Sequence, residues 1–430
     1  MAEDEQIRRR IEVRISQGEF LAGVLHLVRN GSAQTQENFI DRLCRIAATL
    51  RAVFDANNLI GSLSYRPATY WEQLRGKAIT FLDGGVANID LPSAAPIGIR
   101  VGSYTVRPGE TDLAKREQFG IELSIVDDLY SQDAFLYDSD FTDVGKLRDA
   151  ARIIAETAAV LQAVSRQDAP DLVFLHGPLI NPAAPYALED FPPYGLDACR
   201  RMLADPDWEG NEDARQFVAL YLELLVRIEA SGRIAIGVVE RAVGRDPVVL
   251  RATLNLLEEA GAVKKDDVRR ILEEVILYGL NDASIFDVVF QEGEYLRPLL
   301  VQRQGPEGKW PEVWKPWIRR YPPALTTYLK PSELTTPFRV ETFKSASTFE
   351  EALDLVFHTS RLLPSYGFPV GLDIVDKYAK VPEWMSRGVR GQHQVVLLQK
   401  ALASGDPRAL TFAKRVLASK GRDWFFRPNA

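Results

Sequence analysis

Cysteine is scarce in this sequence, and its scarcity excludes two kinds of stabilising element. Among 430 residues the chain has only Cys44 and Cys199. Two cysteines do not build the disulfide framework that small secreted domains use, so we expect a cytoplasmic protein. They also form no Cys-x-x-Cys pair, and the four histidines are scattered, which excludes a structural zinc site of that type.

Long apolar runs are also missing. A membrane span needs about 18 consecutive apolar residues, and no such run occurs. The chain starts MAEDEQIRRRIEVRI, acidic and then basic, so we expect neither a secretory signal nor a membrane segment. No Gly-x-x-x-x-Gly-Lys-Ser/Thr or Gly-x-Gly-x-x-Gly stretch follows a predicted strand. Their absence argues against the alternative of an α/β enzyme of nucleotide metabolism.

A net positive charge is the third missing feature. The sequence has 52 Lys and Arg against 59 Asp and Glu, a formal net charge of −7. Proteins that hold DNA alone usually carry a basic surface, because neutralisation of phosphates supplies most of their non-specific affinity. Either the basic residues gather locally, or a partner delivers the nucleic acid.

The remaining composition is that of a globular protein larger than one average domain. Hydrophobic residues make up 46% and charged residues 26% of the chain. A core with appended helical parts is the expected organisation at this length. We predict an N-terminal helical region at 1–75, a core domain at 76–400 with a helical insertion at about 182–280, and a C-terminal helix and tail at 401–430.

Hydrophobic periodicity predicts an α/β core. Apolar or alternating runs predict strands at 78–82, 97–106, 119–126 and 172–175, and an apolar face with helical spacing runs through 143–165. The first run ends in Asp83-Gly84-Gly85, which we interpret as a turn that glycine permits. Strand, strand, strand, helix, strand is the opening order of a ribonuclease H-like mixed sheet flanked by helices. Other α/β domains share that order.

Further elements are predicted around this core. Helical spacing recurs over 3–60, 212–230 and 246–278, with a Pro-rich loop at 182–212 and a buried strand at 233–239. The segment LNLLEEAGAV in the helical pair resembles half of a winged helix, and Trp310, Trp314 and Trp317 follow it. We interpret both features as packing elements, with contact to DNA as the alternative for each.

Carboxylates at strand ends and on the predicted helix suggest metal-dependent chemistry. Phosphodiester cleavage with divalent cations needs several carboxylates that converge on one point. Asp83 follows the first buried strand, and Gly84 next to it would allow a close approach; a turn-capping Asp is the alternative. Glu156 and Asp149 lie on nearly the same face of the predicted helix, so one of the two could face the site.

Two later segments offer further ligands. His176 stands at the end of the strand in VFLHGPL, and a neutral imidazole there could ligate Mn²⁺, although a structural hydrogen bond is the more common role. Asp373 and Asp376 follow a Pro-containing turn at the predicted start of a helix. Capping of that helix would explain both acids without catalysis.

Six short blocks in a fixed order resemble the NurA family over roughly residues 75–385. The blocks are FLDGGVA, VFLHGPLIN, GVVERAVGR, LNDASIFDVVFQEGEYLRPLLV, PFRVETF and YGFPVGLDIVDKYAKV. NurA proteins are DNA exonucleases and endonucleases with a ribonuclease H-like core. The resemblance therefore implies a metal-dependent DNA nuclease that forms a homodimer and has a HerA-type hexameric ATPase as its partner.

The resemblance also implies a site that binds Mn²⁺ or Mg²⁺. The family uses a strand-end Asp, a helix carboxylate, a second strand-end Asp, and a late Tyr and His. Asp83 matches the first position, and Glu156, with Asp149 as its rival, matches the second. His176 occupies the place of the second strand-end Asp, in the family's DGPL or DGSL pattern.

Three further positions differ from the family pattern. Phe368 aligns with the late Tyr, Asp376 with the late His, and Glu240 with a Lys. Either the metal site has been lost and the chain is an adaptor that binds and regulates the ATPase ring, or ligands have been exchanged. Exchange is the hypothesis we favour, because carboxylate and imidazole can trade places where ligands converge. Asp83 and Asp376 would then bind the metals, Glu156 the second ion, and His176 a metal or the attacking water.

Overall fold

The structure, a computed structural model, describes most of the chain. It covers residues 2–35, 41–88, 96–128, 144–187, 216–240, 246–302, 304, 310–343, 346–363 and 365–414. Most of the loop predicted at 182–212 lies outside the described residues, as does the end of the predicted C-terminal tail.

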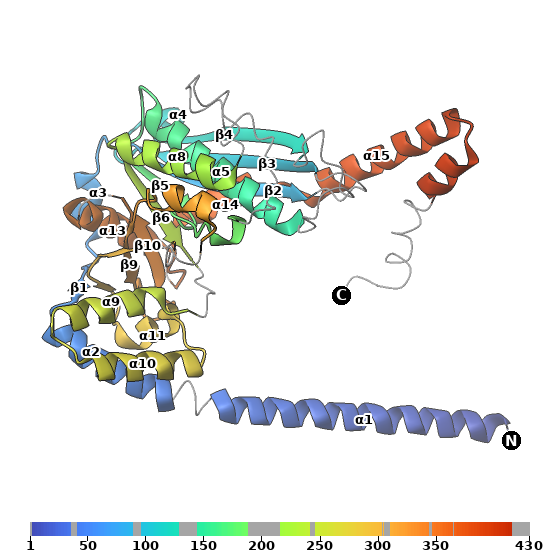
Figure 1. The fold of residues 1–430 in the computed structure, drawn as a ribbon, viewed down its shortest axis with the longest axis horizontal. Coiled ribbons are helices and arrows are strands. Elements are labelled where there is room, and N and C mark those ends of the chain that lie inside the picture. The colour runs from blue at the N-terminus through green and yellow to red at the C-terminus, as the bar shows by residue number, and fades with distance from the viewer. Residues whose placement is uncertain are drawn as a thin grey trace.

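A mixed sheet of ten strands forms the centre of the molecule (Figure 1). The strands are β1 (Ile60–Ser62), β2 (Ile79–Asn88), β3 (Pro96–Val106), β4 (Glu117–Asp128), β5 (Leu172–His176), β6 (Ile234–Val239), β7 (Glu294–Leu296), β8 (Leu299–Val301), β9 (Ala324–Leu329) and β10 (Phe338–Thr342). Their order is β1-β7-β9-β10-β6-β5-β2-β3-β4, and β8 pairs with β9.

The half of the sheet from β4 to β6 has the topology that the sequence predicts. β2, β3 and β4 form an antiparallel meander. β5 pairs with β2 in parallel, and β6 pairs with β5 in parallel. Helix α5 (Val144–Ser165) lies between β4 and β5 in the chain. This arrangement confirms a ribonuclease H-like mixed sheet flanked by helices.

Helices cover both faces of the sheet and one of its ends (Figure 1). The other helices are α1 (Ala2–Thr35), α2 (Cys44–Ala56), α3 (Pro67–Gln73), α4 (Leu113–Arg116), α8 (Phe217–Ala230), α9 (Val248–Glu259), α10 (Lys265–Leu277), α11 (Asp282–Val289), α12 (Lys315–Ile318), α13 (Ala346–Ser360), α14 (Val370–Ala379) and α15 (Glu383–Ala403). Short 3-10 turns span Ala184–Tyr186 and Glu312–Trp314.

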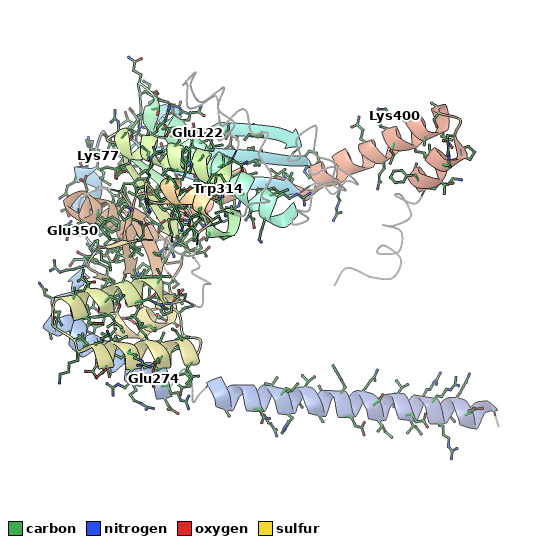
Figure 2. All side chains as sticks on the ribbon, in the orientation of Figure 1. Lys77, Glu122, Glu274, Trp314, Glu350 and Lys400 are labelled. Carbon is green, nitrogen blue, oxygen red and sulfur yellow. The ribbon has the colours of Figure 1, made fainter. Side chains whose placement is uncertain are left out.

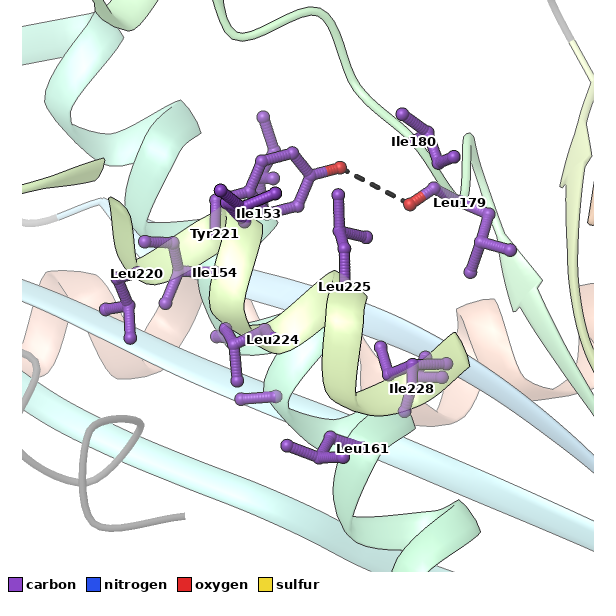
Figure 3. Packing of buried hydrophobic residues seen from close by; sticks show 14 of the residues in the cluster. Ile153, Ile154, Leu161, Leu179, Ile180, Leu220, Tyr221, Leu224, Leu225 and Ile228 are labelled. Carbon is purple, nitrogen blue, oxygen red and sulfur yellow. Dashed lines mark hydrogen bonds between the residues drawn. The ribbon is translucent and has the colours of Figure 1, made fainter. Parts of the chain in front are cut away.

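The side chains of each strand point alternately to the two faces of the sheet, and a different set of helices packs on each face. In β2, Leu82 belongs to the apolar cluster of α5 and α8, whereas Phe81 belongs to the cluster of α3, α13 and α14. Successive side chains of a strand point to opposite faces, so Asp83 shares the face of Phe81. On the other face α5 packs against α8, where the Tyr221 hydroxyl donates to the Leu179 carbonyl at 3.3 Å (Figure 3).

One face of the helical pair and two of the three tryptophans are buried in the protein. Helices α9 and α10 bury Leu250, Leu254 and Val275 in one cluster with α2 and α11. Trp310 and Trp314 are each only 7% exposed in the cluster of α5 and α8. The packing interpretation is confirmed for Trp310 and Trp314, because side chains buried this deeply have little surface on which bases could stack.

Helix α1 extends away from the body of the molecule, and its side chains project around it (Figure 2). Its large apolar residues are exposed, among them Phe20 at 75% and Leu27 at 70%. None of the helices in the described part of the chain combines the length with the hydropathy that crossing a bilayer requires.

The predicted turn at Asp83-Gly84-Gly85 is wrong, because β2 continues through these residues to Asn88. Asp83 pairs with Gly102 of β3, and the two glycines pair with the residues that precede Gly102. The glycines serve close packing. A Cβ on Gly84 would lie 2.5 Å from Oε1 of Glu156, and one on Gly85 would lie 2.0 Å from the carbonyl oxygen of Ala379.

Candidate metal centre

A polar cavity of about 680 Å³ opens where β2, β5 and α14 meet. It is lined by carboxylates, two basic side chains and two aromatic rings, namely Asp83, Glu240, Asp373, Asp376, Arg152, Lys380, Tyr366 and Phe368, together with His176, Gly84, Gly177 and Val239. The four elements that carry the predicted ligands, β2, α5, β5 and α14, therefore each have a residue at this cavity.

Asp83, His176 and Asp376 form a compact group of potential metal ligands. One ligand atom from each lies within 4.8 Å of those from the other two. Asp83 and His176 stand on adjacent parallel strands, and Nδ1 of His176 lies 3.3 Å from Oδ2 of Asp83. The other oxygen of Asp83 accepts the backbone N–H of Gly84 at 2.8 Å, which orients the carboxylate.

Asp376 reaches the group from α14. The helix starts at Val370 without a side-chain cap, and Asp373, not Asp376, is the acid of its first turn. The capping interpretation is therefore wrong for Asp376. Its Oδ2 accepts from Nζ of Lys380 at 2.6 Å, and its side chain is 28% exposed. Asp373 accepts from Lys377 and Tyr366, and these two hydrogen bonds, Lys377 first, lower the pKa of Asp373.

Close backbone packing holds α14 against the sheet. Gly85 and Gly102 leave room for Tyr378 and Ala379 at the end of the helix. The guanidinium of Arg100 donates to the carbonyl oxygens of Tyr378, Ala379 and Lys380. A cation at a helix C-terminus satisfies carbonyls that have no partner within the helix. This clamp fixes the segment that carries Asp376.

Glu156 lies beside the group but has a different partner. Its carboxylate is 6% exposed, and Nη1 of Arg152 contacts its two oxygens at 2.9 and 3.2 Å. Burial raises the pKa of Glu156 to about 7; the charge of Arg152 opposes this rise, and the charge of Asp83 adds to it. Asp149, the alternative helix acid, is exposed and is not among the described residues that line the cavity.

The surroundings of His176 favour its charged form. Burial lowers the pKa of His176, but the hydrogen bond and charge of Asp83 outweigh this and raise the pKa above its usual value. On the other side of the ring, Nε2 lies 3.9 Å from Oε2 of Glu240. The ring of Phe368 packs against His176 with centroids 5.2 Å apart. Phe368 and Glu240 are two of the positions at which the sequence analysis expects a departure from the family pattern. Both thus lie next to His176.

Three cavity residues do not emerge from the sequence analysis. Arg152, Tyr366 and Lys380 all line the cavity. Helical spacing from the candidate acids could have indicated two of them, since Arg152 precedes Glu156 by four residues and Lys380 follows Asp376 by four. Tyr366 stands two positions before Phe368 and supplies a hydroxyl to the same cavity. Burial, then its hydrogen bond to Asp373, raises the pKa of Tyr366.

Fold and site together define a ribonuclease H-like α/β protein with clustered oxygen and nitrogen ligands at the sheet. Residues 77–381, which are most of the chain, match the family model of the NurA domain. The protein belongs to the NurA family.

Solved structures show the same kind of likeness at low identity. The NurA nuclease from Sulfolobus solfataricus is 12% identical, with 89% of this chain and 96% of that chain covered and a TM-score of 0.48. A structure of NurA with manganese is 13% identical, with 85% and 98% covered and a TM-score of 0.38. Human ENDOV is 11% identical, with 83% and 99% covered and a TM-score of 0.30. No curated protein matches the chain.

Proposed function

We propose that the protein is a metal-dependent DNA nuclease that hydrolyses phosphodiester bonds at the cavity between β2, β5 and α14. The observation that carries this proposal is the convergence of Asp83, His176 and Asp376, whose ligand atoms all lie within 4.8 Å of one another. Membership of the NurA family, which includes a solved NurA nuclease, supports the same function.

The donor set fits a divalent cation. Two carboxylates and one imidazole suit Mn²⁺, which accepts nitrogen ligands more readily than Mg²⁺ does. Clustered carboxylates repel one another, and a cation at their centre would remove that repulsion. Manganese-containing structures of other NurA proteins support Mn²⁺ as the natural choice, with Mg²⁺ as the alternative.

The residues of the cavity have distinct tasks in hydrolysis. The oxygen of a water molecule bonds to phosphorus while the bond from phosphorus to a sugar oxygen breaks, and that sugar oxygen leaves with a proton. A bound divalent cation would stabilise the charge on the phosphate oxygens. Asp83 and Asp376 would hold the cation, and His176 would either ligate it or orient the attacking water. Arg152 and Lys380 supply positive charge at the cavity wall.

The proposed nuclease would act together with other protein chains. We infer that the protein acts as a cytoplasmic homodimer with a HerA-type hexameric ATPase, in DNA end processing, repair or defence. The net charge of −7 supports delivery of DNA by a partner, because the chain has no overall basic field. The exposed apolar side chains of α1 support a contact surface outside the nuclease core.

An adaptor without catalysis is the competing function. Glu240 at the cavity favours it, since a carboxylate there opposes the approach of a phosphate. On this alternative the NurA fold binds and regulates the ATPase ring, and the cavity performs no chemistry.

Cleavage of linear DNA separates the two functions. The purified chain is incubated with Mn²⁺ and linear DNA, with and without the ATPase, beside the Asp83→Ala variant. We expect cleavage by the unaltered chain and its loss in the variant. Equal traces of cleavage in both proteins would contradict the nuclease and support the adaptor.

A further inference from the structure

The arginine of the cavity wall is bound to the acid that would serve a second cation. Arg152 and Glu156 are four residues apart on α5, and Nη1 of Arg152 contacts both carboxylate oxygens. The Arg152 side chain is 39% exposed and lines the cavity, whereas that of Glu156 is 6% exposed. The guanidinium therefore lies between the buried carboxylate and the space that substrate would enter.

Glu156 lies next to Gly84 of β2 and is not part of the ligand group. Asp83 shares a sheet face with Phe81, which packs in the cluster of α14, and Gly84 faces the other way, toward α5. A Cβ on Gly84 would lie 2.5 Å from Oε1 of Glu156, so the carboxylate occupies the space that a side chain would fill. Within the described residues, the set of ligand atoms that lie within 4.8 Å of one another includes Asp83, His176 and Asp376 but not Glu156.

The ligand group and Glu156 have separate sources of positive charge. A cation held by Asp83, His176 and Asp376 would neutralise the ligand group. The guanidinium of Arg152 already neutralises Glu156, and it cannot give up its proton to make room for a metal ion. A second cation would have to displace a bound guanidinium from a carboxylate that is almost fully buried.

We propose that this centre binds one divalent cation, and that Arg152 takes the place of a second one by binding a phosphate oxygen of the DNA. The proposal rests on the proposed nuclease function and departs from the sequence prediction that Glu156 binds a metal ion. The planar guanidinium has donors beyond the one that contacts Glu156, and its geometry suits phosphate oxygens. Two-metal centres neutralise the same phosphate charge with their second ion.

Manganese stoichiometry on the full chain tests the proposal. Isothermal titration calorimetry would measure Mn²⁺ binding, and electron paramagnetic resonance would detect coupling between neighbouring Mn²⁺ ions. We expect the unaltered chain to bind one equivalent without coupling. Arg152→Ala and Arg152→Gln should free the Glu156 carboxylate and bind two coupled equivalents. The double variant Arg152→Gln with Glu156→Gln should return to one equivalent.

A matched control removes a different arginine from the same helical region. Arg166 pairs with Glu122 just beyond the end of α5 and does not line the cavity among the described residues. We expect Arg166→Gln to retain one equivalent of Mn²⁺ and unchanged binding of a DNA oligonucleotide. Arg152→Gln should weaken binding of the oligonucleotide at least tenfold in metal-free buffer, where only the protein's own charges act on phosphate. Far-UV circular dichroism would check that each variant is folded.

The possible results separate this proposal from the nuclease function. Two equivalents in the unaltered chain, or one equivalent in both Arg152 variants, would overturn the single-cation centre and leave the nuclease proposal intact. No binding of Mn²⁺ by the unaltered chain would overturn the metal-dependent function itself. If both Arg152 variants fail to fold, the number of Mn²⁺ ions bound by the unaltered chain tests the proposal. Two coupled Mn²⁺ ions in the unaltered chain would contradict it.

Discussion

The imidazole of His176 and the carboxylate of Asp83 lie side by side, although 93 positions separate them in the chain. The pairing of Leu82 with Leu175 on parallel strands places the next residue of each strand at the same end of the sheet. Nδ1 of His176 thus lies 3.3 Å from Oδ2 of Asp83 on the neighbouring strand. The hypothesis of exchanged ligands requires such a contact between these two side chains.

Replacing His176 by Asp would introduce the residue that the resemblance implies for this position. We expect His176→Asp to shift metal preference from Mn²⁺ toward Mg²⁺, because the harder cation favours oxygen over nitrogen ligands. The ratio of cleavage rates with the two metals measures the shift. His176→Ala is the control, and it should lose activity with both metals. An unchanged ratio in His176→Asp would show that His176 does not contact the cation.

Asp376 and Asp373 provide a matched pair on one helix. Asp376 belongs to the ligand group, whereas Asp373 is held by Lys377 and Tyr366. We expect Asp376→Asn to weaken Mn²⁺ binding by more than the roughly 10–100-fold that loss of an outer-shell partner causes. Asp373→Asn should weaken it by less than about tenfold, which is below that range, because Asp373 lies outside the ligand group. Calorimetric titration with Mn²⁺ measures both, and equal losses would argue against Asp376 as the ligand.

Gly85 tests the close packing of α14 on β2. A Cβ at this position would lie 2.0 Å from the Ala379 carbonyl oxygen, which is backbone and cannot move aside alone. We expect Gly85→Ala to lower the free energy of unfolding by about 1–3 kcal/mol, the usual cost of overpacking. Urea denaturation followed by circular dichroism measures the change.

Gly98→Ala is the control for Gly85→Ala. Gly98 lies on the neighbouring strand β3, and its added Cβ would meet only the Ala87 side chain at 3.4 Å. We expect a change below about 1 kcal/mol, within the range of tolerated substitutions. Similar losses in both variants would mean that a methyl group on these strands is costly in general, and that the approach of α14 does not set the cost.

Arg100 tests whether the clamp on α14 positions Asp376. Arg100→Ala removes the donors to three carbonyl oxygens at the end of the helix. We expect a loss of about 1–3 kcal/mol in stability, as for hydrogen bonds from charged donors, and weaker Mn²⁺ binding. Arg100→Lys keeps the charge near the helix end and should lose less. Mn²⁺ binding unchanged in Arg100→Ala would show that α14 keeps its place without the clamp.

Local patterns were sufficient to predict much of the core. Alternating and helical periodicities predicted β2 to β5 and α5, because each element buries one set of side chains at its own characteristic spacing. The same analysis misassigned Asp83-Gly84-Gly85 as a turn. Glycine marks both turns and close approaches, and only the presence of Glu156 and Ala379 beside the strand distinguishes the two.

The sequence by itself determined several elements of the core and which candidate acids they carry, since periodicity depends on neighbours in the chain. Only the tertiary structure decided that Asp83, His176 and Asp376 meet while Glu156 is held by Arg152. That outcome depends on the register of β2 against β5 and on the docking of α14, which are contacts between distant segments. Periodicity carries no information on them, because it records which face of an element is buried and not which partner buries it.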